Sequence, residues 1–341
     1  MKKIASILLF LVLIFVIENY RRDFINADDQ NPKKGQSAAS DSIIITDNTK
    51  INHRFPEFYR GIYLTIESGR NLERLKQFVE LAKKSYINTF VIDVQSSRIK
   101  KCMVPAEHVN YLLQNGIHPV ARVVMFPDGL KEYPLPQGLL EDRLTVAEES
   151  ARNGFKEIQF DYIRFNDSDR LRHLSIGERY AFIENIFSKA RERLKKYNVR
   201  IAADVFGRIP LNKNDLIGQR MEGLDKVVDI ICPMAYPSHY TWSKKMQHDP
   251  YYTVFVTSKS AEDRTKQAGI VTYIQAFKMK LGPNSYDSYI EAQIKAIHDS
   301  GVSGFIMWNA RQEYGIPLTV ARNYYSGKIS KVKSDQKTVS D

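Results

Sequence analysis

Glu157-Ile158-Gln159-Phe160-Asp161-Tyr162-Ile163-Arg164-Phe165 is the stretch of this chain that points most directly to its fold. An apolar, strand-like run there ends in a carboxylate and a guanidinium. Similar segments recur along the chain and alternate with helix-like stretches. Their polar or aromatic ends are Asp93, Asp161, Asp204, Tyr236, Gln275 and Trp308. This pattern is typical of a (β/α)8 TIM barrel, whose site is assembled from residues at the carboxyl ends of the strands.

The alternation begins at Phe55 and predicts eight strands. Their segments are continuously apolar, as expected of parallel strands that are buried on both faces. The predicted strands are 59–66, 87–94, 118–126, 155–165, 200–207, 229–236, 270–277 and 304–310. The predicted helices between them are 72–84, 106–114, 139–153, 176–197, 219–226, 261–267 and 286–299.

A doubly wound open sheet is the competing architecture. Proteins of that class that bind nucleotides carry a glycine-rich phosphate loop after the first strand. Here the corresponding segment is only Ser68-Gly69-Arg70. Together with the count of eight strands, this favours the barrel.

The N-terminus, residues 1–26, is predicted to be a signal peptide or an uncleaved N-terminal anchor. Lys2 and Lys3 precede an apolar run from Ile4 to Ile17. That run is shorter than the roughly 20 residues of a spanning helix and suits the apolar region of an export signal. Ala27 is only a weak cleavage site, so both forms stay open. We expect export across the cytoplasmic membrane, with the barrel secreted or tethered through residues 4–17.

Three further parts follow the export signal. Residues 27–54 are polar and too poor in apolar side chains to fold, so they are predicted to be a disordered linker. Residues 55–327 would form the barrel domain. Residues 328–341 are a polar tail, which we expect to lack structure.

Composition excludes several classes of site. Cys102 and Cys232 are the only cysteines, which argues against a disulfide scaffold and a cysteine-based zinc site. No two histidines have the spacing of a zinc site, so no metal and no cofactor are expected. The net charge of +11 favours an anionic neighbour such as a membrane surface or an acidic polymer. Nucleic acid is not expected as a partner, because export separates the chain from it and the lysines are spread along the sequence.

Five segments make the chain resemble a family of bacterial exported TIM-barrel proteins classed as glycoside hydrolases. The hallmark of that family is a fourth strand reading Phe-Asp-Tyr-Ile-Arg-Phe, here Phe160 to Phe165. Asn166 follows where the family usually has proline, which changes the shape of the loop. The other matching segments begin at Arg60 (Arg-Gly-Ile-Tyr-Leu-Thr), Asn88 (Asn-Thr-Phe-Val-Ile-Asp-Val), Ala203 (Ala-Asp-Val-Phe-Gly) and Cys232 (Cys-Pro-Met-Ala-Tyr-Pro-Ser-His-Tyr). The resemblance implies a glycosidase.

Asp161, Asp204 and Asp93 are the candidate catalytic residues. Alternation lets Asp161 and Asp204 share a pocket from neighbouring strands, which lie about 4.8 Å apart. Their carboxylates could then approach the roughly 5 to 5.5 Å spacing of a retaining glycosidase, whereas Asp93 at roughly 10 Å from Asp161 suits an inverting pair. The sequence does not choose between these pairs. The plainer alternative is that the aspartates cap helices or pair with Arg122 and Arg164.

The remaining candidate residues would bind the sugar. Trp308 is expected beneath a sugar ring, because an aromatic face stacks on the apolar face of a pyranose; core packing is its alternative. The segment 237–260 is predicted to be a long loop, and its aromatic content suits a polysaccharide cleft. The predicted substrate-binding residues are Tyr63, Arg122, Arg164, Tyr236, His239, Trp242, Gln275 and Trp308.

The sequence therefore predicts an exported glycoside hydrolase that uses carboxylate acid/base chemistry on a cell-envelope or extracellular polysaccharide. A polysaccharide or oligosaccharide is the expected partner. The rival interpretation is a non-catalytic barrel that binds a glycan or an envelope protein. A carbohydrate deacetylase is a weaker third candidate, because it would need a set of metal-binding His and Asp residues that the sequence does not offer.

Overall fold

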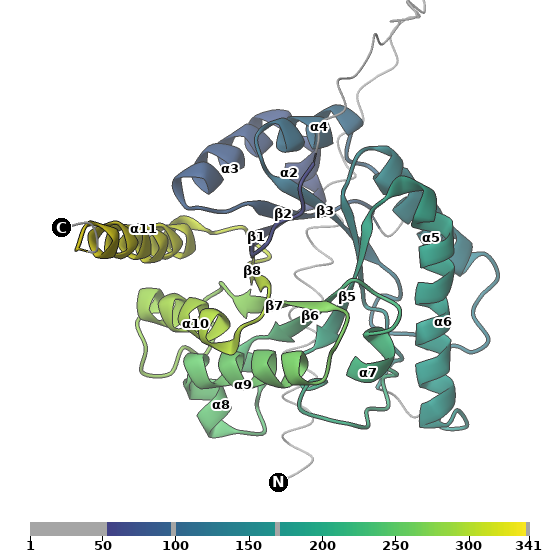
Figure 1. Ribbon diagram of the computed structural model, residues 1–341. Helices are drawn as coiled ribbons and strands as arrows, with labels where there is room; N and C mark the ends of the chain where they lie inside the picture. The colour runs from purple at the N-terminus through teal and green to yellow at the C-terminus, as the bar shows by residue number, and fades with distance from the viewer. Residues whose placement is uncertain (1–52, 97–99, 168–170, 339–341) are drawn as a thin grey trace, which may run out of the picture. The chain divides into compact units, whose positions relative to one another are not determined.

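The computed structural model describes residues 53–96, 100–167 and 171–338 (Figure 1). The predicted signal or anchor at 1–26 lies outside these ranges, as does the predicted linker up to residue 52. Within the ranges, no helix is long and apolar enough to cross a membrane. His53, in the predicted linker, packs on the barrel, because its Nε2 lies 3.0 Å from Nδ1 of His118.

Eight parallel strands close into a barrel in sequence order, which confirms the predicted (β/α)8 fold. Gly304 permits the closure between the last strand and the first, because a Cβ atom there would lie only 2.2 Å from the carbonyl oxygen of Tyr59. The strands are β1 (Tyr59–Leu64), β2 (Thr89–Asp93), β3 (His118–Val124), β4 (Glu157–Asp161), β5 (Arg200–Phe206), β6 (Ile230–Ala235), β7 (Gly269–Gln275) and β8 (Gly304–Trp308).

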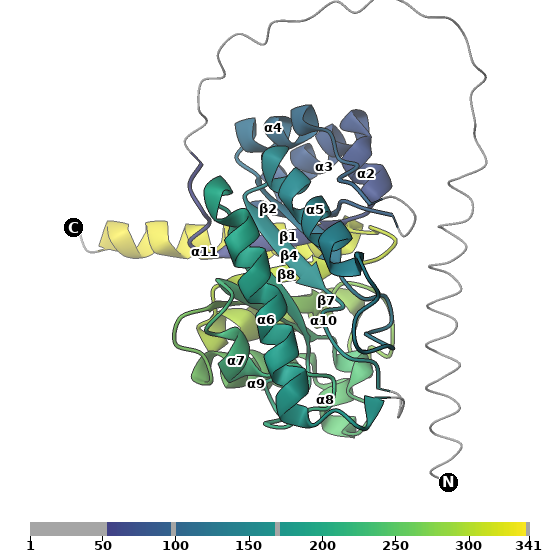
Figure 2. The same ribbon diagram turned by 90° about the vertical axis from the view of Figure 1, so that its right-hand side faces the viewer.

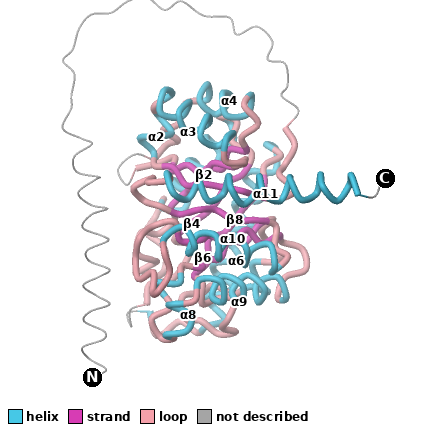
Figure 3. The backbone as a smooth tube through the Cα atoms, turned by 90° about the vertical axis from the view of Figure 1, so that its left-hand side faces the viewer, coloured by secondary structure: helices cyan, strands magenta, loops and turns pink. Residues whose placement is uncertain are grey.

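Helices surround the strands, as the cyan and magenta tube of Figure 3 shows. Capping residues in the local sequence favour the start of several of these helices. Ser175 and Glu178 form a capping box at the start of α6, the long helix in front of the barrel in Figure 2. The helices are α2 (Ile66–Arg70), α3 (Leu72–Lys84), α4 (Ala106–Gln114), α5 (Leu139–Arg152), α6 (Ile176–Leu194), α7 (Met221–Leu224), α8 (Lys244–His248), α9 (Pro250–Asp263), α10 (Tyr286–Ser300) and α11 (Gly315–Thr338), with the 3-10 turns η2 (Lys195–Tyr197) and η3 (Pro237–His239).

Three predictions about secondary structure are wrong. The segment 237–260 is not one loop, since it contains η3, α8 and most of α9, and the helix predicted at 261–267 is only the end of α9. The Asp249 side chain accepts a hydrogen bond from the amide of Tyr252, and Pro250 follows it, so the start of α9 is strongly capped. At the other end of the chain, α11 runs to Thr338, so most of the tail is helical.

The barrel interior is filled by side chains beneath the carboxyl ends of the strands. Gln159 crosses it, donating to the Cys232 sulfur at 3.0 Å and accepting from the Tyr273 hydroxyl at 2.8 Å. Apolar neighbours complete this inner cluster: Tyr59, Val91, Val120, Ala202, Ile230, Val271 and Ile306. The barrel is therefore a packed core rather than a pore, and charged side chains gather at its two ends.

Candidate active site

Three carboxylates meet around the guanidinium of Arg122, which lies on β3 inside the barrel mouth. Its Nη1 donates to Oδ1 of Asp93 at 2.5 Å. Its Nε donates to Oδ2 of Asp161 at 3.1 Å, and its Nη2 binds the same oxygen. Oδ2 of Asp204 lies 4.0 Å from that Nε. One positive charge thus faces three carboxyl groups, and the structure brings all three predicted catalytic residues together.

The strand register explains this meeting. Arg122 lies opposite Asp93 on β2 and opposite Gln159 on β4. Side chains of a strand alternate between its two faces, so Asp161, two residues beyond Gln159, faces the same interior one layer higher. The long side chain of Arg122 therefore reaches carboxylates at the ends of two different strands.

Asp204 is the most buried of the three carboxyl groups, with 2% of the residue exposed. Its Oδ1 has no hydrogen-bond partner among the described residues. Burial, and then the negative charge of Asp161, raise the pKa of Asp204 well above its usual value, although Arg122 acts in the opposite direction. Asp161, by contrast, accepts hydrogen bonds from Arg122 and from the amide of Tyr162. Neighbouring carboxyl groups in such different environments can divide acid and base roles.

An aromatic wall lies beside Asp93 and Arg122. The Tyr63 hydroxyl donates to Oδ2 of Asp93 at 2.5 Å. The rings of Tyr63 and Trp308 are 4.0 Å apart and inclined by 35°. The Arg122 guanidinium carbon lies 5.2 Å from the centre of the Trp308 ring, within cation–π distance. Trp308 is half-buried, so it belongs to the site and still presents part of its surface.

Tyr236 approaches the carboxylates from β6. Burial, and then the charges of Asp204 and Asp161, raise the pKa of its phenol well above the usual value. Its ring meets those of His239 at 5.4 Å and Phe277 at 5.7 Å. His239 is exposed, so this group extends from the carboxylates toward solvent.

Gln275 and Trp242 have other surroundings. The amide of Gln275 is fully buried and binds only backbone groups, donating to the carbonyls of Phe277 and Met279 and accepting from the amide of Ser238. It joins the segments that follow β6 and β7. Trp242 is 61% exposed and its ring lies 5.0 Å from that of Tyr240, which is buried in the core.

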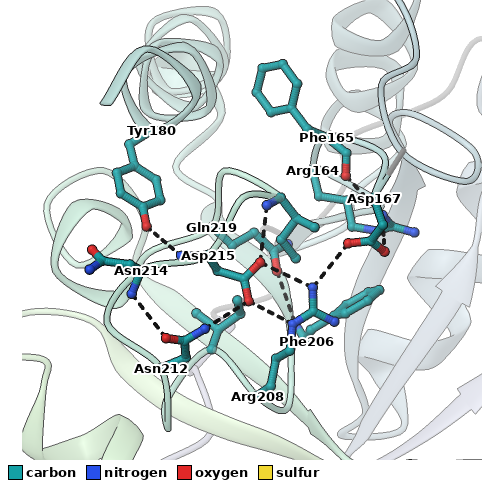
Figure 4. Close-up of polar contacts among 12 residues, drawn as sticks. Arg164, Phe165, Asp167, Tyr180, Phe206, Arg208, Asn212, Asn214, Asp215 and Gln219 are labelled. Atoms are coloured by element: carbon teal, nitrogen blue, oxygen red, sulfur yellow. Dashed lines mark hydrogen bonds and ion pairs between the residues drawn. The ribbon is translucent and has the colours of Figure 1, made fainter. Parts of the chain in front are cut away.

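Arg164 belongs to a second polar cluster, which Figure 4 shows together with Asp167, Arg208 and Asp215. Its guanidinium lies over the ring of Phe206 at 4.6 Å, and that of Arg208 lies over the same ring at 5.0 Å. Sequence reasoning missed Phe206 and Arg208. Period-two alternation from Asp204 points to Phe206, but Arg208 follows β5 in irregular backbone, where no periodicity predicts its direction.

No group of three or more His, Cys, Asp or Glu side chains is placed to hold a metal ion in the part of the chain that the structure describes. In the mouth, the guanidinium of Arg122 already stands among the three aspartates.

Several solved structures share this fold. The glycoside hydrolase domain of PgaB (BpsB) from Bordetella bronchiseptica superposes with a TM-score of 0.58 at 10% identity, covering 78% of this chain and 98% of that one. The endo-beta-1,4-mannanase of Thermotoga petrophila gives 0.56 at 11% identity, covering 80% and 77%. The spore cortex-lytic enzyme SleL of Bacillus cereus gives 0.55 at 11%, covering 79% and 74%. At these identities the likeness concerns the fold alone.

No curated protein matches the chain. A family model described as "Putative glycosyl hydrolase domain" does match, over residues 134–314. The match runs from the segment before α5 to just past β8 and includes Asp161, Asp204 and Trp308, while Asp93 and Arg122 precede it. Because it covers more than half of the 341 residues, the chain belongs to this glycosyl hydrolase family.

Proposed function

We propose that this glycan-acting hydrolase cleaves a cell-envelope or extracellular polysaccharide by carboxylate acid/base chemistry, with Asp161 and Asp204 as the working pair. The observation that carries the proposal is the unequal environment of these neighbours. Burial raises the pKa of Asp204 well above its usual value, while Asp161 accepts hydrogen bonds from a guanidinium and a backbone amide.

The pair suits a glycosidic bond cleavage in two steps. Asp204, protonated, would donate its proton to the leaving oxygen as the bond to the anomeric carbon breaks. Asp161, ionised, would attack that carbon or stabilise its developing positive charge. Asp204 would then take a proton from the water that releases the sugar. The surplus of negative charge around Arg122 favours such a cationic transition state.

The inverting alternative uses Asp93 with Asp161. These two bind different nitrogens of Arg122, so the guanidinium separates them. A water molecule activated by one carboxylate would then attack on the face opposite the leaving group. In both geometries Arg122 is a positioning residue that orients the acids, and Trp308 offers an aromatic face for a sugar ring.

The proposed cellular location of this activity is inferred from the N-terminal sequence alone. Lys2 and Lys3, followed by the apolar run from Ile4 to Ile17, support export, with the barrel secreted or tethered outside the cytoplasm. Cell fractionation with a C-terminally tagged full-length chain tests this. Recovery of the barrel in the cytosol would contradict it.

The rival function is a binding barrel without catalysis, and one observation favours it. Arg122 engages Asp93 and Asp161 directly and all three carboxyl groups are buried, as in a purely structural ion cluster. Such a barrel would bind a glycan through Trp308, His239 and Trp242 without turnover.

Asp161→Asn separates the two functions. The amide keeps the shape and loses the charge, so we expect hydrolysis to fall by about 10² to 10⁴ while the melting temperature changes little. The full-length chain and the variant are assayed for released reducing ends on a panel of bacterial polysaccharides. Undiminished turnover in a folded variant would remove Asp161 from the mechanism. Binding of a polysaccharide without turnover by either protein would establish the rival.

A further inference from the structure

Two arginines flank one aromatic ring at the carboxyl end of β5. Arg164 and Arg208, here called the arginine pair, stack on Phe206, the last residue of β5 (Figure 4). Arg164 is buried and donates through Nη1 to the carbonyl of Phe165. Its Nε is buried and has no acceptor among the described residues. Arg208 is about one third exposed, so the pair reaches the surface.

A single exposed carboxylate lies between the two guanidiniums. Asp167 is 61% exposed, with one oxygen 3.3 Å from Nη2 of Arg208 and the other 3.6 Å from Nη1 of Arg164. Charge-assisted hydrogen bonds are normally about 2.7 to 2.9 Å long. Exposed ion pairs of this kind contribute little stability. Asp167 is therefore a loosely held anion that another carboxylate can replace.

Arg208 is held more firmly by Asp215 than by Asp167. Asp215 accepts from its Nε at 2.7 Å and from its Nη2 at 3.2 Å, forming a bidentate pair. The backbone amide of Asp215 donates to the Tyr180 hydroxyl, and the amide of Ile217 donates to its carboxylate. With Asp215 neutralising one arginine, displacement of Asp167 leaves one positive charge without a counter-ion.

The side chain of Gln219 links the backbone segments that carry the arginine pair and the candidate catalytic residues. Gln219 donates from Nε2 to the carbonyls of Asp204 and Ile163, and its Oε1 accepts from the amide of Phe206. This one side chain fixes the segment that carries Arg164 against the strand that carries Asp204. A group bound by the arginines would lie at the same end of the barrel as the candidate catalytic carboxylates, because Phe206 is the last residue of the strand that carries Asp204.

We propose that the arginine pair is a subsite for a sugar ring that carries a carboxylate, so that the substrate is an acidic polysaccharide. Calling the bound polysaccharide a substrate rests on the proposed function. Planar guanidinium groups match carboxylate geometry, and a carboxylate is the ligand that the pair already holds. Asp167 holds the position that the carboxylate of the sugar would take. The net charge of +11 agrees with a polyanionic partner.

The test measures binding rather than turnover. Dissociation constants of the full-length chain are determined for polygalacturonate, alginate and hyaluronan, each beside its carboxyl-reduced, uncharged form. We expect at least one acidic polymer to bind about tenfold or more tightly than its reduced form. Arg164→Gln should abolish that preference. Asp167→Asn removes the competing anion and should strengthen binding of the same polymer about threefold.

Arg152→Gln is the matched control, because it removes the same charge from a mostly exposed arginine on α5. It should leave the preference unchanged. The proposal is overturned if no acidic polymer binds better than its reduced form, if Arg152→Gln acts like Arg164→Gln, or if Asp167→Asn weakens binding. Asp167 is exposed, so this last variant stays informative if Arg164→Gln fails to fold. Binding with the expected preference but without hydrolysis would contradict the proposed function and leave the subsite standing.

Discussion

Strand β4 carries a buried carboxylate at each of its ends, Glu157 at its first residue and Asp161 at its last. At the first end, Glu157 accepts from the Tyr59 hydroxyl at 2.7 Å and from Nε2 of His118 at 3.2 Å, and a carboxylate that only accepts makes His118 the donor. Arg200 donates to the same Tyr59 hydroxyl at 2.8 Å. Here one carboxylate has several donors.

At the other end of β4 the ratio of donors to carboxyl groups is reversed, since Asp161 shares Arg122 with Asp93 and Asp204. Surplus negative charge persists there because the carboxyl groups outnumber the cations. Burial, and then the negative charge of Asp161, raise the pKa of Asp204. The comparison teaches that burial alone does not mark a candidate catalytic group: several donors surround the carboxylate at the first end of β4, whereas three carboxyl groups surround one cation at the last end.

The largest expected difference between the two ends of β4 is in the rate of hydrolysis. A plot of kcat/KM against pH should be bell-shaped, because the working pair needs one ionised and one protonated member. The alkaline limb should belong to Asp204, whose pKa is raised. Asp204→Asn should lower the rate at neutral pH by about 10² to 10⁴ and remove or move that limb.

Glu157→Gln is the control at the opposite end of the barrel, and its folded fraction should keep both limbs in place. An Asp204→Asn profile with an unchanged alkaline limb would assign the acid role elsewhere. If only an Asp93→Asn variant moves the profile, the inverting pair is the better one.

The second effect is on stability. Arg122→Gln leaves three buried carboxyl groups without a cation, so we expect the free energy of unfolding at neutral pH to fall by about 3 to 5 kcal/mol. Arg200→Gln at the other end loses mainly its hydrogen bond to Tyr59, which is worth about 1 kcal/mol. Urea denaturation of both variants checks the difference. Equal losses would mean that the two ends do not differ in charge balance.

The smallest effect is on how the free energy of unfolding depends on pH. The groups at the two ends of the barrel should contribute slopes of opposite sign. Burial, and then the charge of His118, lower the pKa of His53 to about 4. The unfolded chain then binds more protons than the folded chain between about pH 4 and 6.5, so this contribution is lost as pH falls through that window. Asp204 acts the other way, because a raised carboxyl pKa stabilises the folded state at low pH and this stability is lost as pH rises.

Urea titrations between pH 4 and pH 8 separate these contributions. His53→Gln should remove a change of about 1 kcal/mol, reduced from the full shift because His53 is half-buried and solvent screens it. Asp204→Asn should remove the opposite slope. Parallel curves for the two variants and the parent chain would show that neither group has a shifted pKa.

Much of the framework follows from local sequence. The bounds of α3 and α4 match the prediction to the residue, because amphipathic periodicity and helix-forming side chains agree there. All eight strands occur where continuous apolar runs predict them. Helix α9 is different: Thr253, Val254 and Thr257 are β-branched and disfavour a helix locally, yet all three are buried where α9 packs against β6, β7 and α10.

For the site, the sequence by itself determined that Asp93, Asp161 and Asp204 lie at one end of the barrel, because every parallel strand delivers its last residues to the same face. Only the tertiary structure decided that Arg122 stands among them and that Asp204 is the most buried. It alone also set Arg208 beside Asp167, 41 residues earlier in the chain. The physical reason is that alternation along a strand selects a face, whereas the distances between side chains, and with them the protonation states, depend on how many charges the closed barrel brings together.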